Sequence, residues 1–468
     1  CDNLIPESQG QFQCVDNDAK SNKSGVVCVP SKYFSATNSS GNRTCNISTF
    51  GDYRVSSDCE LYDTVTVETG KTLKLGGGSP PPSISGTFKK RLFLVLHGST
   101  LILNSLILTR GHAFEGNGGA VFVGGENSLL NATNCKFIEN VATALPDIST
   151  FGRGGAVALN DHAAANIFYC IFSKNTADMD GGGIHGADSV RLNINSSQFF
   201  ENEAFAYYGG AIHVTGYSVL SLLSSELKYN SAYYSGGGLN VYNRVQVLIQ
   251  DCLIYGNVAG IRGGGIHFYY LHDTAIVLNS KIYSNLAAYD GGGVKARGLN
   301  TKVYLQESFL VNNSRYNGIG GAVYVHDAAS VYLIDSYFHG NTGDDVGLVA
   351  NDNVEAFVIN QNKQNVSAWD FNSGGKAAVK SCSEAPSQCD YLYPTHYVCR
   401  DRNHVVGVDC FRKCNIPREG TAYVTTDCMV DAEIVVTGKL NVTGVPGADG
   451  ALPKVIGGGS NRLFKVEN

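Results

Sequence analysis

Residues 199–212 read Phe-Phe-Glu-Asn-Glu-Ala-Phe-Ala-Tyr-Tyr-Gly-Gly-Ala-Ile, and this stretch holds both signatures of an internal repeat. One signature is Gly-Gly-(Ala/Gly)-aliphatic, which recurs eight times at a nearly constant step, apart from a longer first step from Val121 to Val157. A nearly constant period of roughly 27 residues indicates stacked units that share one core. The aliphatic positions are Val121, Val157, Ile184, Ile212, Leu239, Ile266, Val294 and Val323.

The other signature is apolar-x-x-Asn, which follows each aliphatic position at a nearly fixed distance, as Asn202 follows Ile184. Between the signatures apolar residues alternate with period two, as in residues 219–223, which is typical of strands. We expect the Asn side chains to form a structural ladder, pointing inward or into a turn and bonded from coil to coil. The members of this Asn ladder are Asn140, Asn175, Asn202, Asn230, Asn257, Asn285, Asn313 and Asn341.

These patterns predict an all-β fold: a right-handed parallel β-helix (solenoid) of about ten coils, flanked by small disulfide-rich modules. Each repeat would hold about three short strands and three turns. One repeat cannot bury its own apolar side, so each strand must pair with its equivalent in the next coil.

The Gly-Gly-Ala-Ile of residues 209–212 and the Phe-Phe-Glu-Asn of residues 199–202 resemble the GGA(I/V/L) and FxxN repeats of chlamydial polymorphic outer membrane proteins. Similar repeats occur in long secreted β-helix proteins of algae and other protists. The resemblance covers roughly residues 60–350. It implies a passenger-like rod, in a family whose members are mostly adhesive or surface-structural.

The fourteen cysteines fall into an early, a middle and a late group. The early and late groups lie in segments with little periodicity, which favours disulfide-stapled modules. A zinc site would need paired short spacings with His, and Cys410-x-x-x-Cys414 lacks them. In the middle group, Cys135, Cys170 and Cys252 are expected to be small buried residues, with a Cys135–Cys170 ladder disulfide as the alternative. The disulfide candidates are Cys1, Cys14, Cys28, Cys45, Cys59, Cys382, Cys389, Cys399, Cys410, Cys414 and Cys428.

Nine Asn-x-Ser/Thr sequons predict covalent N-glycans and, with the disulfides, a secretory route to an extracellular or cell-surface location. Four of them crowd into residues 22–48, which chance does not easily explain. The acceptors are Asn22, Asn38, Asn42, Asn46, Asn131, Asn195, Asn312, Asn365 and Asn441.

The net charge of −6 and the charged fraction of 16% argue against a nucleic-acid partner, which needs a basic face. No run of eighteen apolar residues is present, so we expect no membrane span in this chain. Because residue 1 is Cys, we interpret the chain as a mature protein or a fragment.

A second, longer period relates the two ends of the chain. Asp58-Cys59 leads into Thr69-Gly70-Lys71 and Arg91-Leu92-Phe93, and Asp427-Cys428 leads into Thr437-Gly438-Lys439 and Arg462-Leu463-Phe464. The nearly constant offset between the two series indicates a tandem array, of which this chain is about one and a quarter units. The alternative is a C-terminal cap. We therefore divide the chain into a cysteine-rich module (1–59), a β-helix (60–380), a second cysteine-rich module (381–428) and the start of a second β-helix copy (429–468).

The sequence gives little support for a catalytic site or a metal site. Asp178, Asp180 and Asp290 precede glycine turns, but no two acids share a column in neighbouring coils, so we expect solvated turn carboxylates and no catalytic residues. His185 and His213 should stack in adjacent coils, within a polar column that faces outward. Imidazoles can bind a metal, but no third ligand is evident, so we predict no metal site and no cofactor.

Six tyrosines crowd the loops before the glycine turns. They can stack on each other from coil to coil, or offer a glycan or partner contact on one edge of the rod. They are Tyr207, Tyr208, Tyr233, Tyr234, Tyr289 and Tyr316.

Together these features favour a non-catalytic extracellular structural glycoprotein, a tandem-repeat building block of a cell-surface filament, a mastigoneme-like appendage or a wall layer. Its partners would be further copies of itself or other subunits of such a fibre. The alternative is an adhesin or glycan-binding surface protein, and a polysaccharide lyase or hydrolase has less support.

Overall fold

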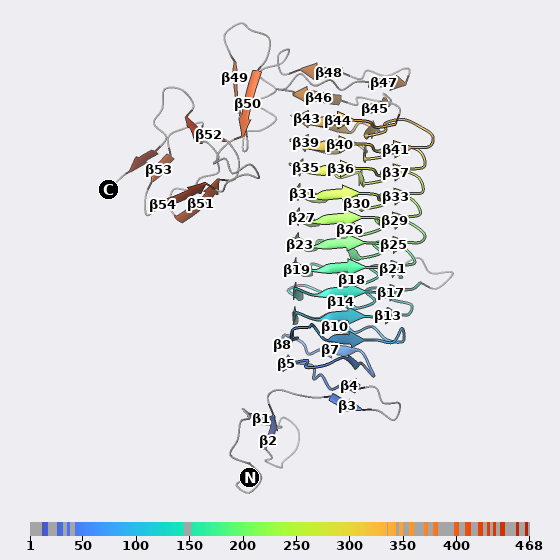
Figure 1. Ribbon diagram of the computed structural model, residues 1–468, viewed down its shortest axis with the longest axis vertical. Coiled ribbons are helices and arrows are strands. Elements are labelled where there is room, and N and C mark those ends of the chain that lie inside the picture. Colours follow the sequence, from blue (N-terminus) through green and yellow to red (C-terminus); the bar gives the residue numbers. More distant parts are fainter. Residues whose placement is uncertain are drawn as a thin grey trace. The chain divides into compact units, whose positions relative to one another are not determined.

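The computed structural model describes residues 44–144, 151–334 and 336–342 with their side chains, and outside these ranges the backbone of further strands. The described chain is all-β, and no helix in it is long and apolar enough to cross a membrane. It forms two compact units, which are treated separately. The first is a parallel solenoid of about ten coils, as predicted, with equivalent strands stacked one above another (Figure 1).

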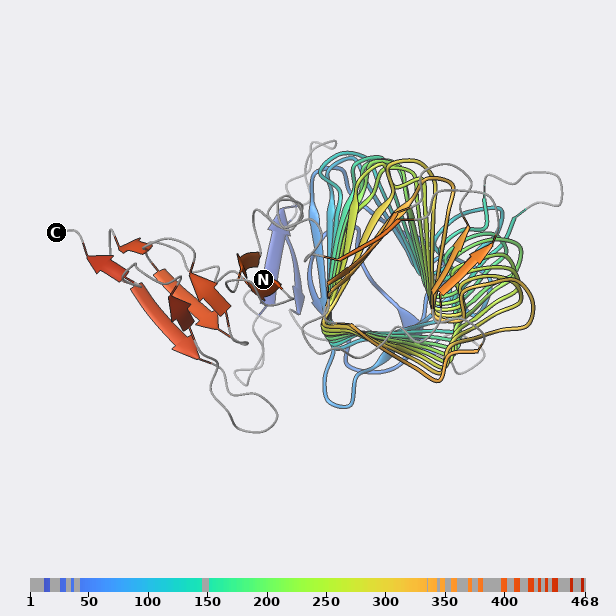
Figure 2. The same ribbon diagram turned by 90° about the horizontal axis from the view of Figure 1, so that it is seen from above.

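Three parallel sheets run along the solenoid, and in view from above they enclose a triangular section (Figure 2). Sheet one consists of β7 (Val65–Val67), β10 (Phe93–Leu96), β14 (Val121–Gly124), β18 (Val157–Asn160), β22 (Ile184–Gly186), β26 (Ile212–Thr215), β30 (Leu239–Tyr242), β34 (Ile266–Tyr269), β38 (Val294–Arg297), β42 (Val323–His326), β45 (Val346–Val349) and β47 (Trp369–Asn372).

Sheet two contains, in coil order, β5 (Gly51–Arg54), β8 (Thr72–Gly76), β11 (Thr100–Asn104), β15 (Leu129–Thr133), β19 (Ala164–Phe168), β23 (Arg191–Asn195), β27 (Val219–Leu223), β31 (Gln246–Gln250), β35 (Thr274–Leu278), β39 (Lys302–Gln306) and β43 (Ser330–Ile334). Sheet three begins with β3 (Ser35–Thr37), which pairs antiparallel with β4 (Arg43–Cys45). It continues in parallel through β6 (Cys59–Glu60), β9 (Ser83–Ser85), β12 (Ile107–Thr109), β16 (Lys136–Ile138), β20 (Ile171–Ser173), β24 (Gln198–Phe200), β28 (Glu226–Lys228), β32 (Leu253–Tyr255), β36 (Lys281–Tyr283), β40 (Phe309–Val311) and β44 (Tyr337–His339).

A fourth, two-residue strand is present in most coils, where the sequence predicted about three strands. The reason is that the residues just after most of the ladder Asn residues continue as a short extended segment, in which a buried Ala is the usual second residue. This sheet four consists of β13 (His112–Ala113), β17 (Val141–Ala142), β21 (Thr176–Ala177), β25 (Glu203–Ala204), β29 (Ser231–Ala232), β33 (Val258–Ala259), β37 (Leu286–Ala287) and β41 (Ser314–Arg315).

The register of the sheets agrees with the repeat found in the sequence. In sheet one the aliphatic residues of the glycine signature are direct partners, for example Ile184 with Ile212 and Ile212 with Leu239. In sheet three the apolar residues of the Asn signature are partners in the same way. There Phe137, Phe172 and Phe199 stack with ring centroids 4.4 and 4.6 Å apart. Similar apolar side chains thus fill the core in columns.

The Asn ladder lies at a corner of the triangle and is fully buried for most of its length. Asn202 Nδ2 donates to Asn230 Oδ1 at 2.9 Å, and the Asn202 backbone N–H donates to the same oxygen at 3.0 Å. Asn230 Nδ2 donates in turn to the Phe199 carbonyl at 3.0 Å. Each Asn therefore satisfies backbone groups that the corner leaves unpaired.

Each Asn is preceded by a left-handed residue that turns the chain, such as Glu201 with φ 54° or Tyr229 with φ 54°. A second corner uses the column of small residues in the same way. There the Ser197 backbone N–H donates to Ser225 Oγ at 3.1 Å.

The N-terminal strands β1 (Phe12–Asp16) and β2 (Val26–Pro30) pair antiparallel, and Cys14 lies opposite Cys28. In the second unit β49 (Tyr397–Asp401) and β50 (Val408–Arg412) pair antiparallel, with Cys399 opposite Cys410. That unit also includes most of β46 (Glu355–Ile359) and all of β48 (Ala378–Ser381).

Three parallel pairs follow in the second unit: β51 (Gly420–Val424) with β54 (Leu440–Gly444), β52 (Cys428–Val430) with β55 (Val455–Gly457), and β53 (Ile434–Val436) with β56 (Phe464–Val466). The first coils of the solenoid contain the same series, with β5 on β8, β6 on β9 and β7 on β10.

Candidate functional site

The polar column of sheet one is buried, which corrects the expectation that it faces solvent. The column follows the second residue of each strand, and its side chains point away from the triangular core. The segments before the glycine turns fold over this face, and the Tyr208 ring stacks on His213 at 6.0 Å. His185, His213 and Lys295 are consequently only 2%, 4% and 2% exposed.

Asp180 is also covered, although we expected a solvated turn carboxylate. It is 7% exposed. Its Oδ2 accepts a charge-assisted hydrogen bond from Arg153 Nε at 3.1 Å, and its Oδ1 accepts the Tyr208 backbone N–H at 3.2 Å. Arg153 lies one coil earlier in the column that precedes the glycine turns, so the stacking of coils creates this pair.

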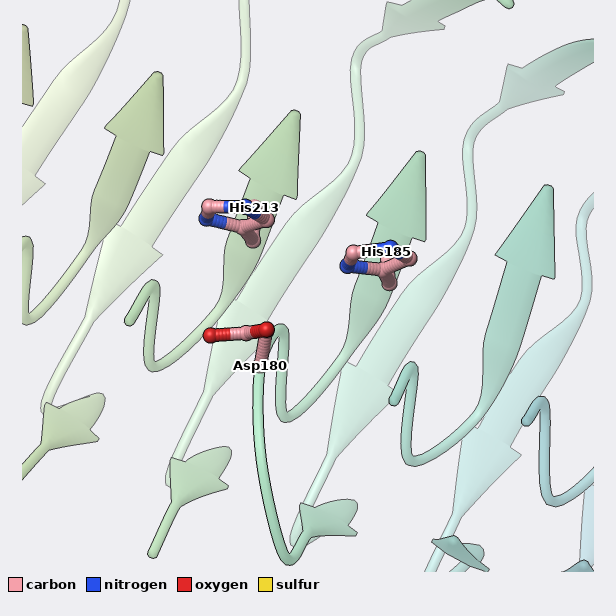
Figure 3. Close-up of side chains that lie close together, drawn as sticks. All are labelled: Asp180, His185 and His213. Carbon is pink, nitrogen blue, oxygen red and sulfur yellow. The ribbon is translucent and has the colours of Figure 1, made fainter. Parts of the chain in front are cut away.

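Asp180, His185 and His213 form one cluster. Asp180 precedes the glycine turn that leads into β22, His185 lies on β22, and His213 is its partner on β26. Figure 3 shows the two imidazoles stacked on neighbouring strands, with the carboxylate on the turn beside them. The rings are 5.2 Å apart at an angle of 10°, and one ligand atom of each residue lies within 4.8 Å of the others.

The imidazoles of this cluster are held neutral by their surroundings. Burial lowers the pKa of His185 well below its usual range, and the nearby His213 and Arg153 act in the same direction. Burial also lowers the pKa of His213, while Asp180 opposes that shift. Both ring nitrogens of His185 and the Nδ1 of His213 have no hydrogen-bond partner among the described residues.

A second cluster repeats the motif with different chemistry. Asp290 precedes Gly-Gly-Gly-Val and then Lys295, just as Asp180 precedes Gly-Gly-Gly-Ile and then His185. Lys295 Nζ lies 3.8 Å from Asp290 Oδ2, and Arg262 Nε lies 3.4 Å from the same oxygen. Burial, with Arg262 in second place, lowers the pKa of Lys295 to about 7.

The acids before the glycine turns do not meet one another. The column that contains Asp180 continues, coil by coil, through Tyr208, Ser235 and Arg262 to Asp290. From Tyr208 onward, each residue forms a parallel β-bridge with the next. Asp178 accepts the Ala144 backbone N–H at 2.9 Å and takes a structural part in the turn. The structure therefore brings together acids with imidazoles or cations, and no pair of described acids in adjacent coils of this column.

Sequence reasoning missed the partners of these acids. The available signal was the spacing, since Arg153 precedes Asp180, and Arg262 precedes Asp290, by about one coil in each case. It also missed the burial of Lys295. Burial depends on which loop covers the strand, and period-two alternation does not report it.

Four of the six tyrosines form a cluster, in which Tyr207, Tyr233 and Tyr234 are exposed and Tyr208 is half-buried. Tyr207 and Tyr208 have centroids 5.8 Å apart, and Tyr234 lies 6.2 and 5.7 Å from them. Tyr233 lies 6.1 Å from Tyr234 and is largely exposed. Coil-to-coil stacking and an accessible aromatic surface thus coexist here. Tyr289 and Tyr316 are exposed, and neither has a ring partner within the part of the chain that the structure describes.

Four sequons can be placed in the solenoid. Asn46 and Asn312 are exposed, and Asn131 and Asn195 are half-buried. Asn131 Oδ1 also accepts a hydrogen bond from Asn166 at 2.9 Å. The acceptors Asn22, Asn38, Asn42, Asn365 and Asn441 have side chains outside the described residues.

Two of the predicted disulfide candidates are bonded to each other: Cys45 and Cys59 form a disulfide with a Cα–Cα distance of 5.0 Å. Cys135, Cys170 and Cys252 are free and buried, and the Cys135 backbone N–H donates to Cys170 Sγ at 3.4 Å, so the ladder disulfide is absent. The side chains of the remaining candidates lie outside the described residues: Cys1, Cys14, Cys28, Cys382, Cys389, Cys399, Cys410, Cys414 and Cys428.

The fold and its ladders define a repeat protein of the parallel β-solenoid class. Residues 169–187 match the Chlamydia polymorphic membrane protein repeat. The chain is also 28% identical, over 135 residues, to a probable outer membrane protein, pmp20, of Chlamydia pneumoniae. That similarity covers 24% of this chain and 8% of the length of the chlamydial protein. No solved structure matches the chain.

Proposed function

We propose that this chain is a non-catalytic structural glycoprotein of a cell surface, a building block repeated in tandem along a filament, appendage or wall layer. The observation that carries the proposal is the continuity of the ladders. In sheet one, residues at equivalent repeat positions pair in coil after coil. The three parallel strand pairs among residues 420–466 follow the same order as those of the first coils. Such a chain can be lengthened by adding units without any new kind of contact.

A surface location fits the family resemblance and the sequons. The matched chlamydial protein is named as an outer membrane protein. Exposed Asn46 and Asn312 offer acceptors for glycans, which would cover a surface with few charges. The mechanical role follows from the physics of the fold, since backbone ladders and close-packed columns of apolar side chains resist bending.

Electron microscopy of the native material at the cell surface tests this proposal. We expect filaments with a regular axial repeat, of about 50 Å or more because ten coils at ~4.8 Å make up one rod. Antibodies against the chain should decorate them at that interval. Single dispersed rods, with no assembly in native material, would refute the structural proposal.

An adhesin or glycan-binding role is the second candidate, and the tyrosine cluster favours it, with Tyr207, Tyr233 and Tyr234 exposed beside the half-buried Tyr208. Aromatic faces on a rigid edge can stack on sugar rings. A glycan array with the wild type and with Tyr208→Ala or Tyr234→Ala decides this point. Binding that disappears in both variants and persists in Tyr316→Ala would support an adhesin. A blank array, or binding that survives both variants, would refute it.

A lyase or hydrolase is the least supported interpretation. Turnover of polygalacturonate or alginate by the purified chain would overturn the non-catalytic proposal, and no turnover above that of buffer is the expected result.

A further inference from the structure

Buried imidazole nitrogens in proteins are nearly always hydrogen-bonded. His185 has two ring nitrogens without a partner in the described chain, and His213 has one. Both rings are stacked and covered, so water does not reach them freely. These three nitrogens lie beside the buried carboxylate of Asp180, and together they offer atoms that could coordinate a metal ion.

We propose that Asp180, His185 and His213 bind one divalent transition-metal ion of the Zn²⁺ type. Two imidazoles and a carboxylate are a usual protein ligand set for Zn²⁺. Their donor atoms already lie within 4.8 Å of one another. In a tetrahedral Zn²⁺ site, with bonds of about 2.0–2.2 Å, neighbouring ligands are roughly 3.3 Å apart. To bind one ion, the two stacked rings must tilt so that a nitrogen of each points to the same site, and their positions as partners on adjacent strands bring them close enough for this.

The Asp290 cluster shows what the same backbone does without imidazoles. There the position of His185 is taken by Lys295 and the position of His213 by Tyr324. The Lys295 ammonium, 3.8 Å from Asp290 Oδ2, supplies a cation to the buried carboxylate. At Asp180 that position holds a neutral metal-binding side chain instead. The Asp290 motif therefore carries its own cation, the Lys295 ammonium, whereas the Asp180 motif carries side chains that can bind a metal ion.

Arg153 is compatible with a bound ion. A carboxylate has about four lone-pair sites, and Arg153 Nε and the Tyr208 N–H use one on each oxygen of Asp180. The second lone pair of either oxygen remains available. Because His, Cys, Asp and Glu side chains supply three ligands here, the fourth position would hold water, hydroxide or chloride. An anion there would reduce the positive charge beside Arg153.

Such an ion would join two coils. Asp180 and His185 belong to one coil and His213 to the next, so the metal would fix a glycine turn and two strands of sheet one to each other. This link between two coils would strengthen a structural rod. The proposal of a metal site does not depend on the structural function, since a lone rod or an adhesin would bind the ion equally well.

The test uses the full chain, secreted from eukaryotic cells in zinc-containing medium and purified without a histidine tag. We expect about one zinc per chain by elemental mass spectrometry, which reads all first-row metals together. Asp180→Asn and His213→Gln should each lower the zinc content at least tenfold. The matched control is His267→Gln, because His267 lies in the same column, is equally buried and is bonded to Asn240 at 2.8 Å. This variant should keep its zinc.

A wild-type chain without stoichiometric metal would overturn the proposal. So would zinc that persists in Asp180→Asn and His213→Gln, because it would then reside elsewhere. If neither variant is secreted, X-ray absorption of the wild type decides. Nitrogen and oxygen neighbours at about 2.0–2.2 Å with two imidazoles support the site, whereas sulfur at about 2.3 Å assigns the metal to cysteines and overturns it.

Discussion

Lys295 places an amino group in the covered column of sheet one, where a charge is costly. Its neighbours are Asp290 at 3.8 Å and the ring of Tyr324, whose centroid is 4.6 Å from Nζ. Arg262, Arg297 and Asp327 also act on it. Burial lowers the pKa of Lys295 most, and Arg262 and Arg297 add to this effect. Asp290 and Asp327 oppose it without cancelling it, so the pKa falls from 10.5 to about 7.

The pH dependence of stability follows from this shift. Between pH 7 and 10 the unfolded chain binds more protons at Lys295 than the folded chain does, so stability rises as the pH rises through this window. Relative to Lys295→Met, the wild type should gain about 3 kcal/mol in the free energy of unfolding between pH 7 and pH 10. Denaturant titrations of both proteins at these pH values measure the difference.

Lys302→Met on β39 is the control for this prediction, because Lys302 is exposed. Its difference from the wild type should not change with pH. If the difference in the free energy of unfolding between the wild type and Lys295→Met did not change over this pH range, burial would not lower the pKa of Lys295.

At the scale of elements, the corners of the solenoid are held by side chains more than by turn residues. The Asn ladder accepts backbone N–H groups in one corner, and the column of Ser and Cys residues does so in another. Each left-handed residue, such as Tyr229, costs conformational energy that these hydrogen bonds offset. Removing one ladder member should therefore affect both adjacent coils.

Asn230→Ala tests this ladder. The substitution would leave the Asn202 amide N–H, the Asn202 side chain and the Phe199 carbonyl without their partner in a buried corner. With about 1–3 kcal/mol for each unsatisfied group, we expect destabilisation of at least about 3 kcal/mol. The measurement is the midpoint of denaturant unfolding and its slope.

Asn193→Ala is the matched control for Asn230→Ala. Asn193 also lies in a row of Asn residues and donates to Asn166 at 2.9 Å, but it is exposed on sheet two. Its loss should cost no more than about 1 kcal/mol. Equal effects of the two substitutions would count against a special role for the buried ladder.

On the scale of the whole molecule, stability should be distributed along the rod. A solenoid is stabilised mainly by contacts between neighbouring coils, so a local change should have local effects. The Cys45–Cys59 disulfide lies at one end, where β4 and β6 pair, and the ladders beyond β8 contain no described disulfide.

Replacing both cysteines, Cys45→Ser with Cys59→Ser, should loosen this end before it melts the rod. We expect faster proteolysis between residues 44 and 60, with the main thermal transition moved by no more than about 2 °C because coils beyond it keep their neighbours. Mass spectrometry of limited digests and circular dichroism measure the two effects. A simultaneous loss of both would indicate one cooperative unit.

The solenoid was predictable from the sequence, because the repeat period states which residues must be neighbours in adjacent coils. The columns of Ile184, Phe199 and Asn202 follow from that period alone. What covers each column depended on the tertiary structure. Period-two alternation predicts that His185 points away from the core, but only the fold of the glycine turn shows that Asp180 and Arg153 close over it. Burial and pairing of that kind depend on loops, whose path is set by contacts between coils and not by local pattern.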